Sequence, residues 1–336
     1  MKTIFTTFLM ILSSIMVLHA QDIHFSQFYN SPLNLNPALT GVFNGDHRFV
    51  ANYRSQWNKV PVNYLTFSGT YDTKLNVKKV YNGVLSAGVK LNYDRAGDSR
   101  LRMSEIGLIG SYTFPINEAN LLTAGFGVDL SNRSFSTTDL RYDDQYDGEI
   151  YNPNIQTSDL FAKQSFIFFG LNAGINYHWQ SLKNKRSKLD AGLGIHQFNQ
   201  PKQSFQDQID VFVSTRFSGY ALGTIKLAEK FDLEVDAMYQ NQGVYKEFVF
   251  GAGLKIYVNN KKGSQFALQP GINLRSNDAI IPYIEFYYEA FKVGLSYDVN
   301  TSPFNVATRY FGGPEMSLIY RIINVRPLQS KPCPIF

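Results

Sequence analysis

The sequence has little cysteine, little charge and no long apolar run beyond its first twenty residues. Cys333 is the only cysteine among 336 residues, which excludes an internal disulfide framework. Charged residues make up 18% of the chain, below the share of about 25% that is usual in soluble domains. After residue 20, no apolar stretch approaches the roughly 18 residues that a membrane-spanning helix needs. If the protein resides in a membrane, helices are not what crosses it.

The sequence also lacks the clusters that catalysis or metal binding would need. Beyond the first twenty residues the histidines are His24, His47, His178 and His196, and none has the close spacing of a zinc motif. No phosphate-cradling glycine loop, nucleophile elbow or carboxylate pair with a supporting base occurs. The net charge of +5 is spread over a long chain and is no nucleic-acid footprint. We therefore predict no enzyme activity, no cofactor, no metal and no nucleic-acid partner.

What is present begins with "MKTIFTTFLMILSSIMVLHA", which has the pattern of a secretory signal peptide. Lys2 supplies the positive start, an apolar stretch runs to Leu18, and Ala20 is a small residue before the cut. We predict that residues 1–20 are removed as the chain crosses the inner membrane.

From about residue 47 the dominant pattern is alternation with period two, which places successive side chains on opposite faces of a strand. In "VLSAGVKLNYD", Leu85, Val89 and Leu91 share one face, and small or polar residues share the other. About fourteen such segments are centred near residues 52, 68, 89, 109, 127, 173, 192, 221, 236, 252, 270, 284, 296 and 318.

These strands share a loose repeat: "SAGVKL", "TAGFGV", "NAGINY", "DAGLGI" and "GAGLKI". Each places alanine on the apolar face and the following glycine on the polar face. Because glycine weakens a strand interior, its repetition suggests a crowded inner wall or the close approach of other chain segments.

An apolar stripe on nearly every strand, polar residues opposite it and an even strand count predict an all-β fold, a transmembrane antiparallel β-barrel spanning residues 47–322. The segments run about nine to eleven residues, the length of a tilted membrane strand. Links alternate between short turns, expected on the periplasmic side, and longer loops, as in bacterial outer-membrane barrels. A soluble β-sandwich or propeller is the alternative, with the apolar faces buried in a core.

Aromatic residues near the strand ends fit an interfacial girdle, as expected of a protein whose partner is a lipid bilayer. They are Tyr93, Tyr112, Tyr177, Trp179, Tyr239 and Tyr288.

Two ends do not fit the barrel pattern, and both are expected at the periplasmic side or inside the lumen. Residues 323–336 form a short tail whose prolines exclude a central strand. Residues 21–46 form an irregular, aromatic opening segment that we predict to fold against the inner wall as a plug or brace, with the inward glycines providing space. The residues expected to do so are Phe25, Phe28, Tyr29, Asn36 and Pro37.

The longest predicted loop, residues 136–164, carries an acidic and aromatic cluster. A calcium site is one interpretation, but the spacing does not match an EF-hand loop, and a solvated external loop is the simpler one. Aromatic anchors among polar groups are typical of protein-binding surfaces. The candidates for partner binding are Tyr142, Asp143, Asp144, Tyr146, Asp147 and Tyr151.

Charged residues of both signs are expected on inward faces, where they would pair across a packed or partly filled lumen. They are Asp232, Glu234, Asp236, Lys188, Lys226, Lys255 and Arg275. An open ion-selective pore would need them spaced around a clear channel. His178 and His196 fall on inward faces of neighbouring strands, most simply as polar lumen residues.

The blocks "HFSQFYNSPLNLNPALTGVFNGDHRFVANYRSQW", "VGLSYDVNTS", "GGPEMSLIYR" and "KPCPIF" are similar to those of the PorP/SprF family of the type IX secretion and gliding-motility system. The block "NPALTG", Asn36 to Gly41, is the most specific part. The resemblance implies an outer-membrane barrel for protein transport that binds, delivers or anchors a secreted surface protein, such as an adhesin with a C-terminal sorting domain. It also implies contacts with periplasmic and outer-membrane components of the secretion machine. A passive porin or small-solute channel is the alternative function.

Overall fold

The computed structural model describes residues 23–56, 64–75, 83–97, 99–137, 140–146, 148–152, 154–155, 157, 163–205, 211–259, 261, 264–303 and 305–323. The predicted signal peptide, residues 21 and 22, the tail beyond residue 323 and Asp147 lie outside these ranges.

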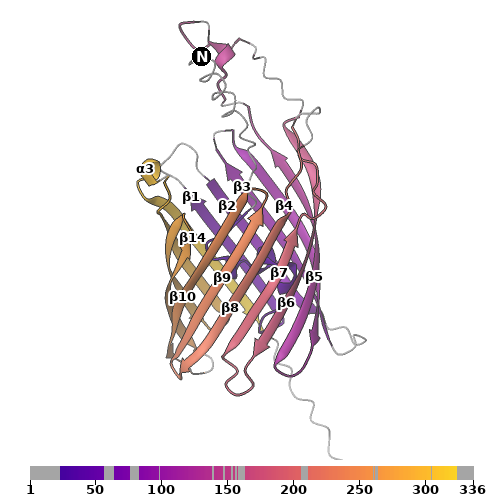
Figure 1. The fold of residues 1–336 in the computed structure, drawn as a ribbon, viewed down its shortest axis with the longest axis vertical. Coiled ribbons are helices and arrows are strands. Elements are labelled where there is room, and N and C mark those ends of the chain that lie inside the picture. The colour runs from indigo at the N-terminus through magenta and orange to yellow at the C-terminus, as the bar shows by residue number, and fades with distance from the viewer. Residues whose placement is uncertain are drawn as a thin grey trace, which may run out of the picture.

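Fourteen antiparallel strands of the described residues close into one barrel (Figure 1), which confirms the predicted fold class. Each strand pairs with its neighbours along the chain, and β1 closes the barrel by pairing with β14, from His47 opposite Ile322 to Arg54 opposite Glu315. The strands are β1 (His47–Gln56), β2 (Tyr64–Leu75), β3 (Val84–Ala96), β4 (Leu101–Pro115), β5 (Asn120–Ser134), β6 (Ser165–Gln180), β7 (Lys188–His196), β8 (Arg216–Ala228), β9 (Phe231–Gln242), β10 (Tyr245–Asn259), β11 (Phe266–Arg275), β12 (Ala279–Tyr288), β13 (Phe291–Asn300) and β14 (Phe311–Ile322).

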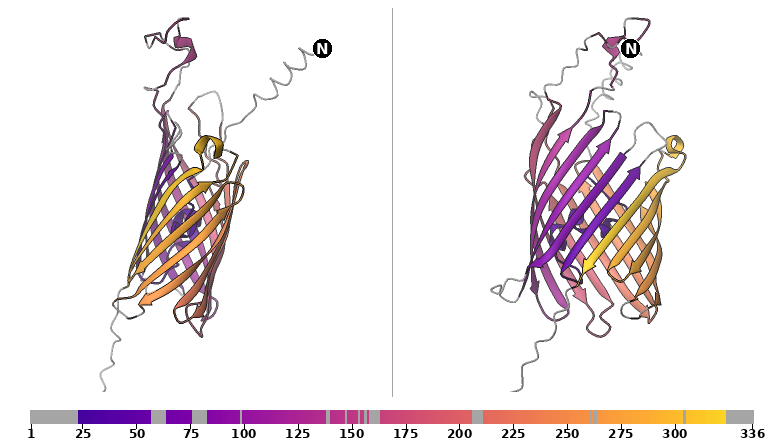
Figure 2. Two further views of the ribbon diagram at one scale, coloured as in Figure 1. Left: turned by 90° about the vertical axis from the view of Figure 1, so that its left-hand side faces the viewer. Right: turned by 180° about the vertical axis from the view of Figure 1, so that it is seen from behind.

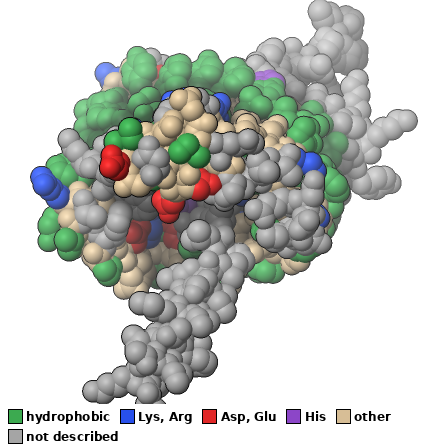
Figure 3. All heavy atoms as spheres, turned by 90° about the horizontal axis from the view of Figure 1, so that it is seen from above, with side chains coloured by type: hydrophobic (Ala, Val, Ile, Leu, Met, Phe, Trp, Pro, Cys, Tyr) green, Lys and Arg blue, Asp and Glu red, His purple; other side chains and the backbone are tan. Residues whose placement is uncertain are grey.

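The outer wall of the barrel is apolar and the inner wall is polar, as the alternation predicts. Leu108 and Leu193, for example, each expose 63% of their surface outward, whereas Asn52, Ser68 and similar polar residues are buried inside. Seen along the axis in Figure 3, hydrophobic side chains ring the periphery. A soluble sandwich or propeller would bury these apolar faces in a core, so the closed barrel excludes that alternative.

Aromatic residues on the outer wall lie towards the strand ends. Tyr177, Trp179 and Tyr288 expose their side chains near the last residues of β6 and β12. Tyr239 does so near the last residue of β9, which lies at the other end of the barrel. These are positions at which aromatic rings meet the interfaces of a membrane.

The two ends of the barrel differ in their links. One, which we name the short-turn end, joins strands through 76–83, 116–119, 181–187, 229–230, 260–265 and 289–290. The other, the long-loop end, includes 135–164, 197–215 and 301–310, with η3 (Asp143–Gln145) and α3 (Asn305–Thr308) (Figure 1). In barrels of this kind the short turns face the periplasm. Within the described ranges, every helix is too short or too polar to cross a membrane.

Residues 23–46, which we name the lumen segment, lie inside the barrel rather than in its wall (Figure 2). They form η1 (Phe28–Asn30), α2 (Pro32–Leu35) and η2 (Pro37–Leu39). Residues 23–41 are buried, apart from the half-buried His24 and Tyr29, so the core of the molecule is the contact between the lumen segment and the inner wall.

Candidate functional site: the lumen segment and its contacts

The lumen segment folds into short helical turns because proline and asparagine set their ends. Pro32 and Pro37 stand in the first turn of α2 and η2, where an N–H group would lack an intrahelical partner anyway. Asn36 caps η2, since its Oδ1 accepts a hydrogen bond from the N–H of Ala38 at 2.8 Å. Gly41, with φ of +76°, then lets the chain turn towards β1.

The lumen segment runs along the barrel from one end to the other. Near the long-loop end, Arg216 donates to the carbonyl oxygen of Ile23 at 3.1 Å and Arg54 to that of His24 at 2.8 Å. At the short-turn end, the N–H of Asp46 donates to the carbonyl oxygen of Ile322 at 2.8 Å. Of the two predicted places, the periplasmic side or the lumen, the segment takes the lumen, and its first described residues lie near the long-loop end.

The predicted plug residues are all inside the barrel, in two apolar clusters and one polar contact. Phe28 packs with Leu35, Leu39 and the wall residues Tyr220, Met238 and Val249, and Tyr29 lies against this cluster. Phe25 packs separately with Ile23 and Met103. Asn36 and Pro37 are buried against β5 and β6. Both clusters lie between the lumen segment and the inner wall, so the segment supplies the apolar core that a barrel with outward-facing apolar side chains lacks.

Three asparagines of the lumen segment anchor it to three sectors of the wall. Asn30 donates to Glu285 on β12 at 2.8 Å and to Ser317 on β14 at 2.9 Å. Asn34 donates to Ser68 on β2 at 2.8 Å. Asn36 donates to the carbonyl oxygens of residues 175 and 193, on β6 and β7, at 3.0 and 3.1 Å. Anchors in three directions fix the segment against rotation as well as withdrawal.

Inward glycines make room for the segment at the places where it touches the wall. A Cβ on Gly125 would strike the backbone of Pro37 and Ala38, and one on Gly174 would strike the side chain of Asn36. Gly125 and Gly174 stand directly opposite each other on β5 and β6, so together they form a flat floor under η2. These are glycines of the Ala-Gly repeat, whose smallness follows from this close approach.

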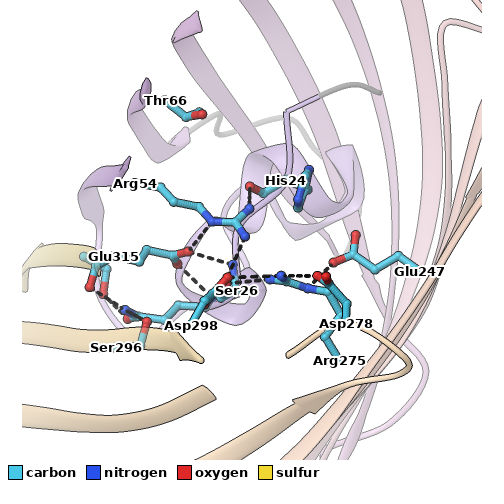
Figure 4. A network of polar contacts seen from close by, with 12 residues as sticks. His24, Ser26, Arg54, Thr66, Glu247, Arg275, Asp278, Ser296, Asp298 and Glu315 are labelled. Atoms are coloured by element: carbon cyan, nitrogen blue, oxygen red, sulfur yellow. Dashed lines mark hydrogen bonds and ion pairs between the residues drawn. The ribbon is translucent and has the colours of Figure 1, made fainter. Parts of the chain in front are cut away.

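A buried network of charges holds the start of the segment near the long-loop end (Figure 4). Ser26 lies at its centre: the N–H donates to Glu315 at 2.7 Å, the hydroxyl donates to Asp298 at 2.7 Å, and Arg275 donates to the hydroxyl at 2.6 Å. Arg54 bridges the two carboxylates, at 2.8 Å from Asp298 and 3.5 Å from Glu315. The network joins β1, β11, β13 and β14, so it ties the segment to the closing seam of the barrel.

A further ion pair holds the end of the segment. Arg48 binds Asp72 through two nitrogens, at 2.8 and 2.7 Å, and also donates to the carbonyl oxygen of Leu39 at 3.0 Å. Asp72 in turn accepts from the N–H of Gly41 at 2.7 Å. Elsewhere Lys90 lies 3.0 Å from Glu105 and 2.9 Å from Asp129, a pairing within the wall beside the segment. Buried charges with such partners are compensated.

Five of the seven inward charges singled out in the sequence have partners, mostly outside their own group. Arg275 pairs with Glu247 and Asp298, Asp232 with Arg186, and Lys226 with Glu229. Glu234 accepts from Thr224 at 2.7 Å, and Lys255 lies 3.5 Å from the ring centre of Tyr287.

The two inward histidines do not form a site together. His178 lies 2.8 Å from Asp190 near the short-turn end, whereas His196 lies 3.2 Å from the carbonyl oxygen of Leu35 in the lumen segment. Among the described residues, no group of three His, Cys, Asp or Glu could hold a metal ion.

The loop candidates lie together at the long-loop end, outside the lumen. Gln145 organises them: its Oε1 accepts from the N–H of Tyr142 and the hydroxyl of Tyr151, and its Nε2 donates to the carbonyl oxygen of Ile155. The rings of Tyr146 and Tyr151 are 6.0 Å apart, and Tyr146 is 57% exposed. The other members are Asp143 and Asp144 in η3, while Asp147 lies outside the described residues.

Sequence reasoning missed several residues that hold the segment, above all Ser26, Asn30, Asn34, Arg54 and Glu315. The polar residues of the opening segment carried a usable signal. Asparagines interleaved with leucine and proline, without a turn or strand pattern, suggest buried amides that need partners. For Arg54 and Glu315 the signal was an inward-facing charge at a strand end, which many barrels also show.

The fold and the filled interior define the chain as a membrane β-barrel of the outer-membrane type. It belongs to the family described as "Type IX secretion system membrane protein PorP/SprF", which matches residues 17–312. The family confirms the predicted resemblance and places the protein in the outer membrane, and family and fold point to a secretion or membrane-channel protein rather than an enzyme.

Solved structures with a similar fold include transporters of small hydrocarbons. The toluene transporter TbuX of Ralstonia pickettii is 9% identical, with 87% of this chain and 94% of that chain covered at a TM-score of 0.50. The CymD monoaromatic hydrocarbon channel is 9% identical, with 88% and 93% covered at a TM-score of 0.49. At this identity the similarity concerns the fold alone. No curated protein matches the chain.

Proposed function

We propose that this barrel is a fixed outer-membrane platform of the type IX secretion system that binds and holds a secreted surface protein at its long-loop end. The observation that carries the proposal is the filled interior: a segment anchored by three asparagines and a buried charge network occupies the lumen. A barrel filled in this way is suited to binding on its rims rather than to passing solutes.

The long loop that contains η3 supplies the partner surface in this proposal. Gln145 and the ring pair preorder its described part, which lowers the entropy lost when a partner binds. Tyr146 and Ile150 are 57% and 66% exposed there. Tyrosine is one of the residue types that dominate the binding energy of protein interfaces. Asp143 and Asp144 beside them would steer a basic partner surface.

Affinity capture of the tagged barrel from native membranes tests the proposal. We expect one large secreted protein to co-purify, and we expect Tyr146→Ala to reduce its recovery at least fivefold. Tyr310→Ala is the matched control, because Tyr310 is 60% exposed on a different loop of the same end. Recovery of periplasmic components of the secretion machine alone, or equal loss with both variants, would contradict the proposal.

The competing function is a passive channel. Single-channel recording in planar bilayers separates the two: a steady conductance typical of porins would favour the channel, and its absence in the wild-type barrel would favour the platform.

A further inference from the structure

Below the lumen segment lies a cavity of about 250 Å³, which we name the vestibule. Tyr29, Asn30 and Pro32 of the lumen segment line one side of it. Lys188 and Arg321, which also line it, stand at the ends of β7 and β14 next to the short turns. The vestibule is therefore the part of the lumen nearest to the periplasmic end.

The wall of the vestibule formed by β13, β14 and β1 carries a cation on each strand. They are Lys292, Arg321 and Arg48, and all three line the cavity. Arg321 stands directly opposite Arg48 in the antiparallel pair of β14 and β1. Lys292 pairs with Ile319, so it is the diagonal neighbour of Arg321 on the other side. Like charges directly across a ladder repel each other, so this arrangement is unfavourable by itself.

Two of the three cations are already neutralised. Arg48 binds Asp72 through two nitrogens, and Lys292 lies 2.9 Å from Glu285. Arg321 differs: among the described residues no carboxylate lies within 4.0 Å of its guanidinium, and its side chain makes no hydrogen bond. Its backbone N–H donates to the carbonyl oxygen of Ala290. Within the described part of the chain, this half-buried guanidinium between two other cations therefore lacks the carboxylate partner that buried arginines usually have.

We propose that Arg321 is the central residue of an anion-binding site in the vestibule, which takes a carboxylate or phosphate group entering from the short-turn end. The planar guanidinium donates a fork of hydrogen bonds that matches the two oxygens of either group. Arg48 and Lys292 add attraction without giving up their own carboxylates. Glu234 and Asp236 on β9, which also line the vestibule, disfavour an anion there and confine it to the β13–β14–β1 wall.

The anion site does not rest on the proposed function, and it has two separate consequences for stability and binding. Filling it must stabilise the folded barrel, because the ligand binds the native state only. Removing the Arg321 charge must weaken the binding of the ligand and relieve the repulsion with Arg48.

The test uses the purified full-length barrel in detergent, with thermal unfolding measured in sodium chloride, inorganic phosphate or citrate at matched ionic strength. We expect phosphate or citrate, but not chloride, to raise the unfolding midpoint in a saturable way. The two probes distinguish a phosphate site from a carboxylate site. Arg321→Gln should weaken the apparent affinity at least tenfold, and Arg321→Lys should weaken it less, because the charge remains but the fork is lost.

Lys230→Gln is the control, since Lys230 is an exposed turn residue at the same end of the barrel. It should leave the saturable shift unchanged. In chloride alone, Arg321→Gln should be at least as stable as the wild type, because the repulsion with Arg48 is relieved. If Arg321 belonged to a structural ion pair, the variant would be less stable than the wild type. The proposal is overturned by the absence of a saturable shift with both probes, by an apparent affinity that is unchanged in Arg321→Gln, or by a loss of stability of that variant in chloride.

Discussion

The side-chain oxygen of Asn36 occupies the space over Gly174 in which the Cβ of any other residue would stand. This relationship joins the most specific block of the family resemblance to one member of the repeated Ala-Gly pattern. The lumen segment and the inner wall are therefore fitted to each other at the level of single atoms.

Gly174→Ala should destabilise the barrel by about 1–3 kcal/mol, the usual cost of forcing an extra carbon into a packed site. The matched control is Gly110→Ala, because a Cβ on the outward Gly110 meets nothing within 4 Å. The measurement is the temperature at which the purified protein loses its folded migration in gel electrophoresis. Equal midpoints for the two variants would show that the segment does not press on Gly174.

Asn36→Ala should destabilise the fold through unmade hydrogen bonds. The amide of Asn36 donates to two strand carbonyls, and its oxygen caps η2. A buried group left without a partner costs about 1–3 kcal/mol. Asn36→Asp keeps the capping oxygen but loses the donors and places a negative charge against two carbonyl oxygens, so we expect it to be worse than alanine. Asn44→Ala, at an exposed position of the same segment, should have the same unfolding midpoint as the wild type. The ranking would be wrong if the aspartate variant were the more stable of the two.

Arg54→Met should be strongly destabilising, by about 3–5 kcal/mol, because it leaves Asp298 and Glu315 buried with their main shared cation removed. Lys226→Gln, which breaks the solvent-exposed pair with Glu229, should have little effect. Chemical unfolding of both variants in detergent measures the difference. If Arg54→Met unfolded at the same denaturant concentration as the wild type, the charge network in Figure 4 would not be what holds Ser26.

Removal of residues 23–44 should open the lumen, so that the barrel conducts ions, provided that the strands still assemble. We expect the wild type to show no steady conductance of porin size in planar bilayers and the deletion variant to show it. Folded migration on gels identifies the fraction that has assembled, so a variant that fails to fold is recognised separately. Steady porin-sized conductance of the wild type would contradict the filled lumen.

The barrel was predictable from the sequence because the alternation of apolar and polar residues in each strand shows which side chains face the membrane and which face the lumen. The alternation in "VLSAGVKLNYD" fixes the face of every residue from Val84 to Asp94, and the same holds for strands such as β5. Link lengths then give the direction of each strand. Neither inference needs knowledge of what fills the lumen.

The contacts of the lumen segment were less predictable, because they join residues far apart in the chain. Ser26 and Glu315 are 289 positions apart, and Asn36 and Tyr220 are 184 apart. Only the composition of the segment and the inward glycines indicated a close approach. No local sequence pattern shows in which direction the segment runs along the barrel. Its start at the long-loop end follows from its contacts with Arg54 and Arg216. The sequence predicts the strands that carry these arginines but not the residues that they bind.

Covalent cross-linking inside the membrane tests the central claim, that the lumen segment is a fixed part of the barrel interior, most directly. Asn34 and Asn92 exchange amide hydrogen bonds of 3.3 and 2.8 Å between the segment and β3. With Cys333 replaced by serine, the pair Asn34→Cys and Asn92→Cys should form a disulfide in native membranes. The pair Asn34→Cys and Asn273→Cys, with the second site on β11 across the barrel, should not. Bonding of the second pair to the same extent, or no bonding of the first, would contradict the account.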